Sequence, residues 1–361
     1  MTSLTRSENV RSASLTSCKP HAVEPHYFGS ISISRVNITA GAYTASASIW
    51  GENVSKQQRA DLDATLRRQP KPPMKQSVEE LRAGFAAVMA TASVPADVRR
   101  TSTLLGDRPA LLVEPEHDAR PGTILYFHGG WWVVGSPETS MSVTANLVSR
   151  TGFRAISLDY RLAPEHPFPA AIEDGVDAFR ALLDSGIDAS SIAFAGDSAG
   201  GGLCVTTCLM ARTAGLPMPA AIVAFSPAVD ATRSGASMDG KAGIDPFFTR
   251  EGLDPTSAMY LAGQDPRQEL LSPAMLADLT GFPPLLLQVG TNEVLLDDST
   301  RLAARARDAG VDVILDVTAG VPHVFQAFVG VLDEADRALD RAALFLKQQL
   351  ALQRAFAGSA M

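Results

Sequence analysis

The chain has 361 residues, of which 46% are hydrophobic and 19% charged, and its 31 Lys and Arg against 39 Asp and Glu give a net charge of −8. These values are typical of a globular protein with one large domain or two ordinary ones. Nucleic-acid binding depends on clustered Lys and Arg, and no basic run exceeds an Arg pair, so we expect no nucleic-acid partner. The apolar stretches are far shorter than the roughly 20 residues that cross a bilayer, so we expect no membrane span.

The cysteines point to a reducing environment. Cys18, Cys204 and Cys208 are too few and too unevenly placed for a disulfide framework or a structural zinc site. Cys204 and Cys208 are four residues apart on an expected helix, where small buried residues commonly form part of the core. We therefore expect no bound metal and a cytoplasmic location.

Residues 1–50 differ from the rest of the chain. They are rich in Ser, Thr and Ala and carry four basic residues against two acidic ones. A secretory signal requires a continuous apolar stretch of about 7–15 residues, which this segment lacks. We interpret it as a disordered leader or an overlong start, with an organelle transit peptide as the alternative.

Residues 51–95 are predicted to form two amphipathic helices that belong to an N-terminal cap. The first lies over 57–69, where apolar and charged residues alternate with helical spacing before Pro70 ends it. Ser77 followed by Glu80 is a capping-box signature, and it opens a second helix with apolar residues along one face. The apolar faces must be covered, so these helices either form a lid over a site or pack on the main body.

From residue 96 onward, short apolar stretches alternate with longer amphipathic ones. The predicted strands comprise a hairpin over 99–104 and 110–114 and further strands at 123–127, 155–158, 191–195, 221–225, 284–289 and 313–317. Helices are predicted over 142–150, 170–183, 199–212, 297–309 and 332–350. This alternation favours a mostly parallel sheet with helices on both faces. Between about 230 and 278 the periodicity weakens, and we interpret that stretch as a cap insertion.

The sequence G-D-S-A-G at 196–200 follows an expected strand and opens an expected helix, which is the setting of a nucleophile elbow. The tight turn forces Ser198 into a strained backbone conformation, and side chains at 196 or 200 would collide with neighbouring backbone. Because Ala199 begins the helix, its N–H group and the helix dipole face an anion that forms on the substrate. A glycine-rich turn of this kind also suits phosphate binding or simple close packing.

The sequence H-G-G-W at 128–131 stands at the carboxyl end of another expected strand, where open α/β sheets build their sites. The N–H groups of Gly129 and Gly130 are predicted to join Ala199 in an oxyanion hole. His128 is a candidate base, but its place before the glycines fits a hydrogen bond that fixes the loop better.

The general base and its acid are predicted from chain order. His323 follows the last expected strand, and the order Ser, acid, His is that of α/β hydrolases. Glu293 comes first in the loop after the strand at 284–289 and is the favoured acid. Asp297 and Asp298 stand where the next helix begins, so helix capping and dipole interactions also explain them, and Asp297 stays open as the alternative acid.

These motifs make the chain from about 57 to 350 resemble the hormone-sensitive-lipase-like carboxylesterases, bacterial family IV of the α/β-hydrolase fold. The stretch D-Y-R-L-A-P-E-H-P-F-P-A at 159–170 is similar to a segment of that family. The resemblance implies a mostly parallel eight-stranded sheet with flanking helices and a helical cap, residues 96–361 as the catalytic domain, and no cofactor. It also implies a triad of Ser198, His323 and Glu293.

Two positions depart from the family pattern. Trp131 replaces the third glycine of the commoner H-G-G-G, and Glu293 stands where many members carry Asp. Backbone N–H groups do not require glycine at 131, and Glu can orient an imidazole as Asp does. The E-V-L-L-D-D stretch at 293–298 most resembles the monoterpene ε-lactone hydrolase subgroup.

The chain is therefore predicted to hydrolyse short-to-medium acyl esters or lactones through an acyl-enzyme intermediate. We assign Trp131, Trp132 and Asp197 to substrate binding, although the two tryptophans fit a packing role equally well. Phe247, Phe248, Met259 and Tyr260 are expected to supply an apolar cap wall. An amide-cleaving deacetylase and a non-catalytic ligand receptor on the same scaffold are the alternatives. Relatives often dimerise, so a homodimer is a further expectation.

Overall fold

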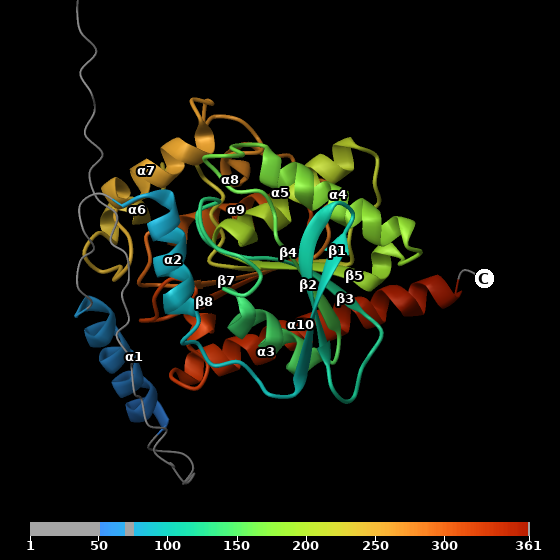
Figure 1. Ribbon diagram of the computed structural model, residues 1–361, viewed down its shortest axis with the longest axis horizontal. Coiled ribbons are helices and arrows are strands. Elements are labelled where there is room, and N and C mark those ends of the chain that lie inside the picture. The colour runs from blue at the N-terminus through green and yellow to red at the C-terminus, as the bar shows by residue number, and fades with distance from the viewer. Residues whose placement is uncertain (1–50, 69–75, 360–361) are drawn as a thin grey trace, which may run out of the picture.

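The computed structural model describes residues 51–68 and 76–359, so the predicted leader at 1–50, with Cys18, lies outside the described residues. Its centre is an eight-stranded sheet of order β1-β2-β4-β3-β5-β6-β7-β8, in which β2 runs antiparallel to its neighbours and all later pairs are parallel (Figure 1). The strands are β1 (Val98–Leu105), β2 (Arg108–Pro115), β3 (Thr123–Phe127), β4 (Arg154–Leu158), β5 (Ile192–Asp197), β6 (Ala221–Phe225), β7 (Leu285–Gly290) and β8 (Val313–Thr318).

The central strands are apolar because helices cover both of their faces. Every residue of β3, β5, β6 and β7 is buried, whereas β8 at the end of the sheet has only half-buried and exposed residues. Continuous apolar runs are typical of such doubly covered parallel strands. The predicted hairpin and all six later strands are therefore confirmed, with bounds that shift by no more than two residues.

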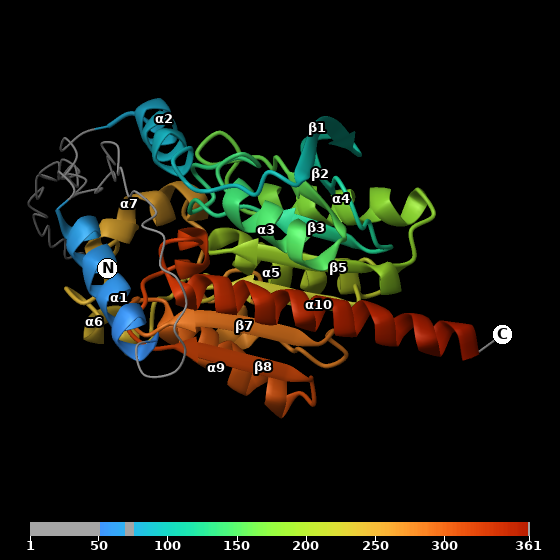
Figure 2. The ribbon, with the colours of Figure 1, turned by 90° about the horizontal axis from the view of Figure 1, so that it is seen from below.

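Two layers of helices enclose the sheet. On one face lie α3 (Met141–Thr151) and α10 (Asp333–Ser359), and α10 runs the length of this layer (Figure 2). On the other face lie α4 (Ala170–Asp184), α5 (Ala199–Thr213) and α9 (Leu296–Asp308). Each layer packs its own apolar core against the sheet, with Leu346 of α10 in one and Phe179 of α4 in the other.

The N-terminal helices occupy two different places. Helix α2 (Val78–Met89) begins with the predicted capping box, in which Ser77 and Glu80 bond reciprocally. It packs Phe85 against the loop that follows β3 and against α7 (Arg250–Leu261). Helix α1 (Gly51–Arg67) instead packs on the segment that follows β8 and on the start of α10. Figure 1 shows both helices on the side of the molecule where α6 (Ser237–Gly240) and α7 lie.

The stretch between β6 and β7 contains the three short helices α6, α7 and α8 (Pro273–Leu276). Its weak periodicity has a structural cause, because α6 and α8 span only four residues each and α7 contains Pro255. Among the described residues, none of the helices combines the length and apolar character that crossing a bilayer requires.

Candidate active site

Ser198 occupies the sharp turn between β5 and α5. Its backbone is strained, with φ 55° and ψ −118°, as the sequence predicts. The turn has no room for larger residues on either side. A Cβ on Gly196 would lie 2.5 Å from the Gly200 carbonyl oxygen, and one on Gly200 would overlap the carbonyl oxygen of Phe127. The two glycines therefore allow β5, the turn and β3 to approach closely, and this approach leaves Ser198 at the carboxyl edge of the sheet.

Three loops at this edge bring Ser198, His323 and Glu293 into one hydrogen-bonded line. The Nε2 atom of His323, from the segment after β8, lies 2.9 Å from Ser198 Oγ. Its Nδ1 atom lies 2.7 Å from Glu293 Oε2, in the loop after β7. Parallel strands end at the same edge of a sheet, which is why residues 125 positions apart along the chain meet here.

Glu293 is held on both sides. Its side chain is fully buried, and its Oε1 atom accepts hydrogen bonds from Gly290 N at 2.7 Å and from Ser226 Oγ at 2.8 Å. The Ser226 hydroxyl in turn accepts a hydrogen bond from Val324 N, next to the histidine. Sequence reasoning missed Ser226, and its only signal is its position directly after β6. Carboxylate and imidazole are thus fixed by one connected set of bonds.

Opposing effects set the proton affinity of His323. Burial by itself lowers the pKa of the imidazole, but the negative charge of Glu293, the hydrogen bond to it and the nearby charges of Asp245 and Asp197 raise the pKa above its ordinary value of 6.5. Asp245 is also buried, and it accepts hydrogen bonds from Phe247 N and Phe248 N of the cap insertion and from Val294 N of the acid loop. Asp245 therefore links the cap insertion to Val294, the residue that follows Glu293.

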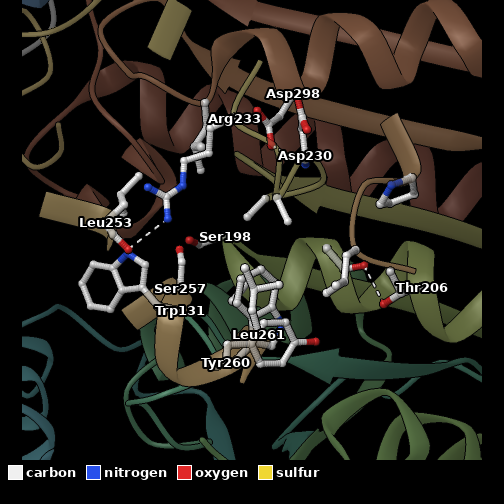
Figure 3. A pocket seen from close by; sticks show the side chains of 18 of the residues that line it. Trp131, Ser198, Thr206, Asp230, Arg233, Leu253, Ser257, Tyr260, Leu261 and Asp298 are labelled. Atoms are coloured by element: carbon white, nitrogen blue, oxygen red, sulfur yellow. Dashed lines mark hydrogen bonds between the residues drawn. The ribbon is translucent and has the colours of Figure 1, made fainter. Parts of the chain in front are cut away.

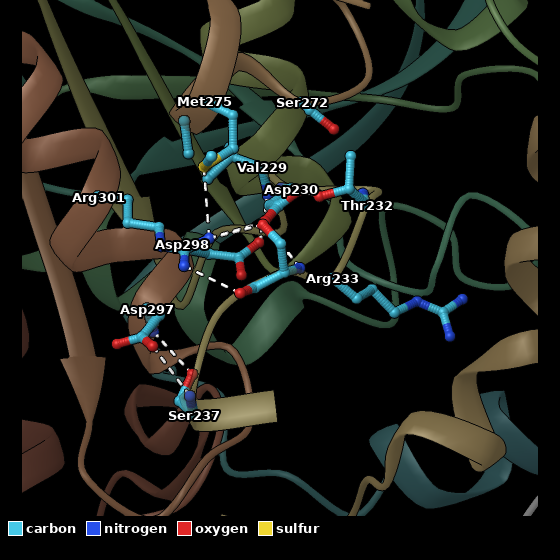
Figure 4. A network of polar contacts seen from close by, with 12 residues as sticks. Val229, Asp230, Thr232, Arg233, Ser237, Ser272, Met275, Asp297, Asp298 and Arg301 are labelled. Carbon is cyan, nitrogen blue, oxygen red and sulfur yellow. Dashed lines mark hydrogen bonds and ion pairs between the residues drawn. The ribbon is translucent and has the colours of Figure 1, made fainter. Parts of the chain in front are cut away.

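The alternative acid lies away from the imidazole. Asp297 accepts a hydrogen bond from Ser237 N at 2.9 Å, and its own N–H donates to the Ser237 hydroxyl (Figure 4). Asp298 accepts hydrogen bonds from Val229 N and Asp230 N. Although both carboxylates stand in the first turn of α9, they hold the segment after β6 rather than the helix end that the sequence suggests.

The three predicted oxyanion donors differ in their bonding. Gly129 N donates a long hydrogen bond of 3.4 Å to Ser140 Oγ, within the protein. The N–H groups of Gly130 and Ala199 make no hydrogen bond with a described residue. His128 stacks on Tyr160 and its Nδ1 atom lies 2.8 Å from the Gly129 carbonyl oxygen. Burial lowers the pKa of His128 to about 4, so it is neutral and fits the loop-fixing role.

A narrow pocket opens from Ser198 between the sheet and the cap (Figure 3). Its volume is about 60 Å³, and Trp131 and Trp132 line it as predicted. Of the expected cap wall, Phe248 and Tyr260 line the pocket, whereas Phe247 and Met259 pack in neighbouring apolar clusters. The polar lining residues include Thr206, Asp230, Arg233, Ser257 and Asp298.

Asp197, which the sequence assigns to substrate binding, is absent from the pocket lining. Its carboxylate is directed below the loop after β3, where it accepts hydrogen bonds from Tyr126 Oη at 2.7 Å and Ser140 Oγ at 2.9 Å. A Cβ on Gly129 would overlap the same carboxylate. Asp197 therefore supports the loop after β3 from beneath and is not part of the pocket lining.

This sheet, with a serine on a strained turn after β5 and a histidine and carboxylate after later strands, defines the class of serine hydrolases of the α/β-hydrolase fold. A family model described as alpha/beta hydrolase fold matches residues 124–327. The chain is 42% identical over 225 residues to an "Acetyl-hydrolase" of Streptomyces hygroscopicus, covering 62% of this chain and 75% of that protein.

Solved structures agree with the sequence comparisons. An "Esterase/Lipase from uncultured bacterium" has a TM-score of 0.77 at 38% identity, covering 81% of this chain and 99% of its own. An "esterase from the bacterial hormone-sensitive lipase (HSL) family" has a TM-score of 0.75 at 37% identity, covering 85% and 100%. The chain belongs to the α/β hydrolase family, within its hormone-sensitive-lipase-like carboxylesterases, and it is a serine ester hydrolase.

Proposed function

We propose that Ser198, His323 and Glu293 are the catalytic triad of this esterase and that it cleaves small uncharged carboxylic esters. The observation that carries the proposal is the continuous hydrogen-bonded line from Glu293 Oε2 through the His323 ring to Ser198 Oγ. Both donor–acceptor distances in that line fall within the range of about 2.6–3.2 Å that proton transfer requires. The line ends at the narrow pocket, where a substrate carbonyl can approach the serine.

In the first half-reaction, Ser198 Oγ attacks the ester carbonyl carbon while its proton moves to His323 Nε2. The π electrons of the carbonyl move to its oxygen, and Gly130 N and Ala199 N donate hydrogen bonds to that oxyanion. Each such donor lowers the barrier by about 3 kcal/mol. The intermediate collapses as His323 returns the proton to the leaving alkoxide, and an acyl group stays on Ser198.

Water repeats the sequence in the second half-reaction. His323 removes a proton from a water molecule, whose oxygen attacks the acyl carbon, and the proton then returns to Ser198 as the carboxylic acid leaves. Throughout, Glu293 accepts the Nδ1–H bond, which keeps the lone pair of Nε2 directed at the nucleophile and stabilises the imidazolium that forms.

The pocket favours short acyl or alcohol groups. Its volume of about 60 Å³ is small, and its walls near the serine are the aromatic rings of Trp131, Trp132, Phe248 and Tyr260. The name of the "Acetyl-hydrolase" relative also fits a short acyl group. Compact lactones have the same neutral ester chemistry and stay within the proposal.

The test is hydrolysis of p-nitrophenyl esters from acetyl to dodecanoyl by the wild type and by Ser198→Ala. We expect kcat/KM to be highest for the short chains and to fall by at least about 10³-fold in the variant. Unchanged rates in Ser198→Ala would overturn the assignment of the nucleophile. ε-Caprolactone then tests the lactone preference, and p-nitroacetanilide beside p-nitrophenyl acetate tests for an amidase.

We also propose a homodimer that forms through β8. This strand ends the sheet, and its residues Ile314 and Val317 are 52% and 43% exposed. Unpaired strand edges with apolar side chains are ready to associate. Light scattering after size exclusion should give twice the chain mass for the wild type and a monomer for Ile314→Lys.

We keep the cytoplasm as the proposed compartment, because Cys204 and Cys208 are free buried thiols.

A further inference from the structure

Asp298 places a buried carboxyl group at the wall of the substrate pocket. Only 3% of the residue is exposed, and it lines the same cavity as Ser198. Its Oδ2 atom accepts hydrogen bonds from Val229 N at 2.8 Å and Asp230 N at 2.9 Å. Its Oδ1 atom makes no hydrogen bond with any residue that the structure describes. Among the described residues, Oδ1 does not belong to the fully buried side-chain atoms that lack a partner, so it is accessible to a small molecule.

The neighbouring carboxylate does not share this property. Asp230, also at the pocket wall, accepts hydrogen bonds from Thr232 and from Ser234 and pairs with Arg301 at 3.2 Å (Figure 4). Its bonding capacity is met within the protein, so it is a structural group. Figure 3 shows Asp298 beside it at one end of the cavity, with Ser198 nearer the centre of the view. Of these two carboxyl groups, only Asp298 has an oxygen atom that makes no hydrogen bond with a described residue.

The bonding of Oδ2 determines what Oδ1 can do. Burial, and then the charge of Asp230 and of Glu293, raise the pKa of Asp298 to about 8. The group is therefore protonated at neutral pH. Because Oδ2 accepts two N–H donors, the proton belongs on Oδ1, which makes Oδ1 the hydrogen-bond donor of this cavity-lining residue.

We propose that Asp298 Oδ1 is a specificity site, which binds an oxygen acceptor of the substrate that lies apart from the ester being cleaved. The matching substrates are small esters whose acyl or alcohol part carries an ether, keto or second ester oxygen. A cationic substrate fits less well, because the Arg233 side chain lines the same pocket. This inference rests on the proposed function, since it assumes that substrate reacting at Ser198 fills this cavity.

The first experiment compares isosteric esters in the wild type and in two variants. The pairs are p-nitrophenyl methoxyacetate with butanoate and p-nitrophenyl 3-methoxypropanoate with pentanoate. For at least one pair, the kcat/KM ratio of ether to hydrocarbon should fall by about 2- to 10-fold in Asp298→Ala, the range of one neutral hydrogen bond. Asp298→Asn should keep the ratio, because its amide oxygen accepts the two N–H bonds while its NH₂ group donates to the cavity. Equal ratios in the wild type and Asp298→Ala would overturn the proposal.

A pH series keeps the proposal testable if Asp298→Ala does not fold. The wild-type ratio should fall as pH rises through about 8, where Oδ1 loses its proton, and it should stay constant in Asp298→Asn. Ionisation of His323 affects both esters of a pair equally, so it does not change their kcat/KM ratio. The charged groups that act directly on Asp298 are Asp230 after β6 and Glu293 in the preceding loop. Arg301 on the same helix pairs with Asp230, and Arg233 and Tyr260 line the same cavity.

The outcomes separate the two proposals. A wild-type ratio that is constant across pH 8 and equal to that of Asp298→Asn would refute the role of Asp298 while ester hydrolysis itself stands. Hydrolysis of both members of each pair that survives Ser198→Ala would instead refute the proposed catalytic serine.

Discussion

Glu293→Gln should remove most of the activity, because it moves the ring proton of His323 from Nδ1 to Nε2. The glutamine oxygen is expected to take the place of Oε1, because Gly290 N and Ser226 Oγ both donate to that position. The NH₂ group then faces His323 Nδ1 at the position of Oε2, 2.7 Å away in the wild type. Nδ1 must accept this bond, so the ring carries its proton on Nε2 and presents an N–H to Ser198. A flipped amide would instead place NH₂ against a buried backbone N–H.

The expected loss in kcat is about 10⁴-fold, or roughly 5 kcal/mol, the size found for a tautomer-reversing carboxylate-to-amide change in a serine protease triad. Steady-state hydrolysis of p-nitrophenyl acetate measures it. The fold should persist, since the amide keeps the shape of the carboxylate, and near-ultraviolet circular dichroism checks this. Glu293→Asp, which withdraws the carboxylate by one methylene, should lose about 10²-fold because the imidazole is no longer well placed.

Asp297→Asn is the matched control. Asp297 bonds to Ser237 and has no contact with His323, so the rate of this variant should stay within about threefold of the wild type. If Glu293→Gln kept nearly full activity while Asp297→Asn abolished it, Asp297 would be the acid and the reasoning from the hydrogen-bonded line would be refuted.

Three further predictions concern pH and packing. The acid limb of the kcat/KM profile should have its midpoint above pH 6.5, because nearby carboxylates raise the pKa of His323 and only the neutral ring accepts a proton; a midpoint below 6.5 would contradict this. Gly200→Ala should yield no folded protein by circular dichroism, since its Cβ would overlap the carbonyl oxygen of Phe127, and a soluble active variant would contradict this. The pKa of Asp298 rises from 3.8 to about 8 on folding, so the native state binds the extra proton between these values. Urea unfolding from pH 9 to pH 7 should therefore show the wild type gaining up to about 1.4 kcal/mol per pH unit relative to Asp298→Asn, whereas parallel curves would refute the shift.

The sheet and the helices around it are predictable from sequence because the local signals agree with the fold. Apolar runs such as 123–127 and 221–225 have the length of strands and have Gly or Pro within two residues of each end. The cap insertion is harder, since a four-residue helix such as α6 spans about one turn and leaves no periodicity to detect. Its position is set by tertiary bonds, among them those of Asp245 and Asp297.

In the candidate site, too, some features could be predicted from the sequence and others could not. Ser198, Glu293 and His323 follow strands at the same sheet edge, so chain order alone brings them together. The bonding of Asp197, Ser226 and Asp298 could not be predicted, because their partners lie some 60 to 70 residues away in sequence. From sequence, an acid beside the nucleophile is interpreted as a functional residue, and an acid at the start of a helix as a cap. Only the strand order shows which neighbouring loop each acid holds.

Trp131, which follows the two glycines of the loop after β3, illustrates how backbone strain and side-chain packing balance. Its φ of 55° costs a non-glycine residue roughly 1–2 kcal/mol. The indole contacts Phe85 of α2 and Phe248 of the cap edge to face, at centroid distances of 5.9 and 5.3 Å, and such pairs contribute about 0.5–1.5 kcal/mol each. The two terms are of similar size, so tryptophan is tolerated there without a large loss of stability. Phe248 in turn contacts the His323 ring at 5.0 Å, so Trp131 links the N-terminal helix, through the cap, to the proposed base.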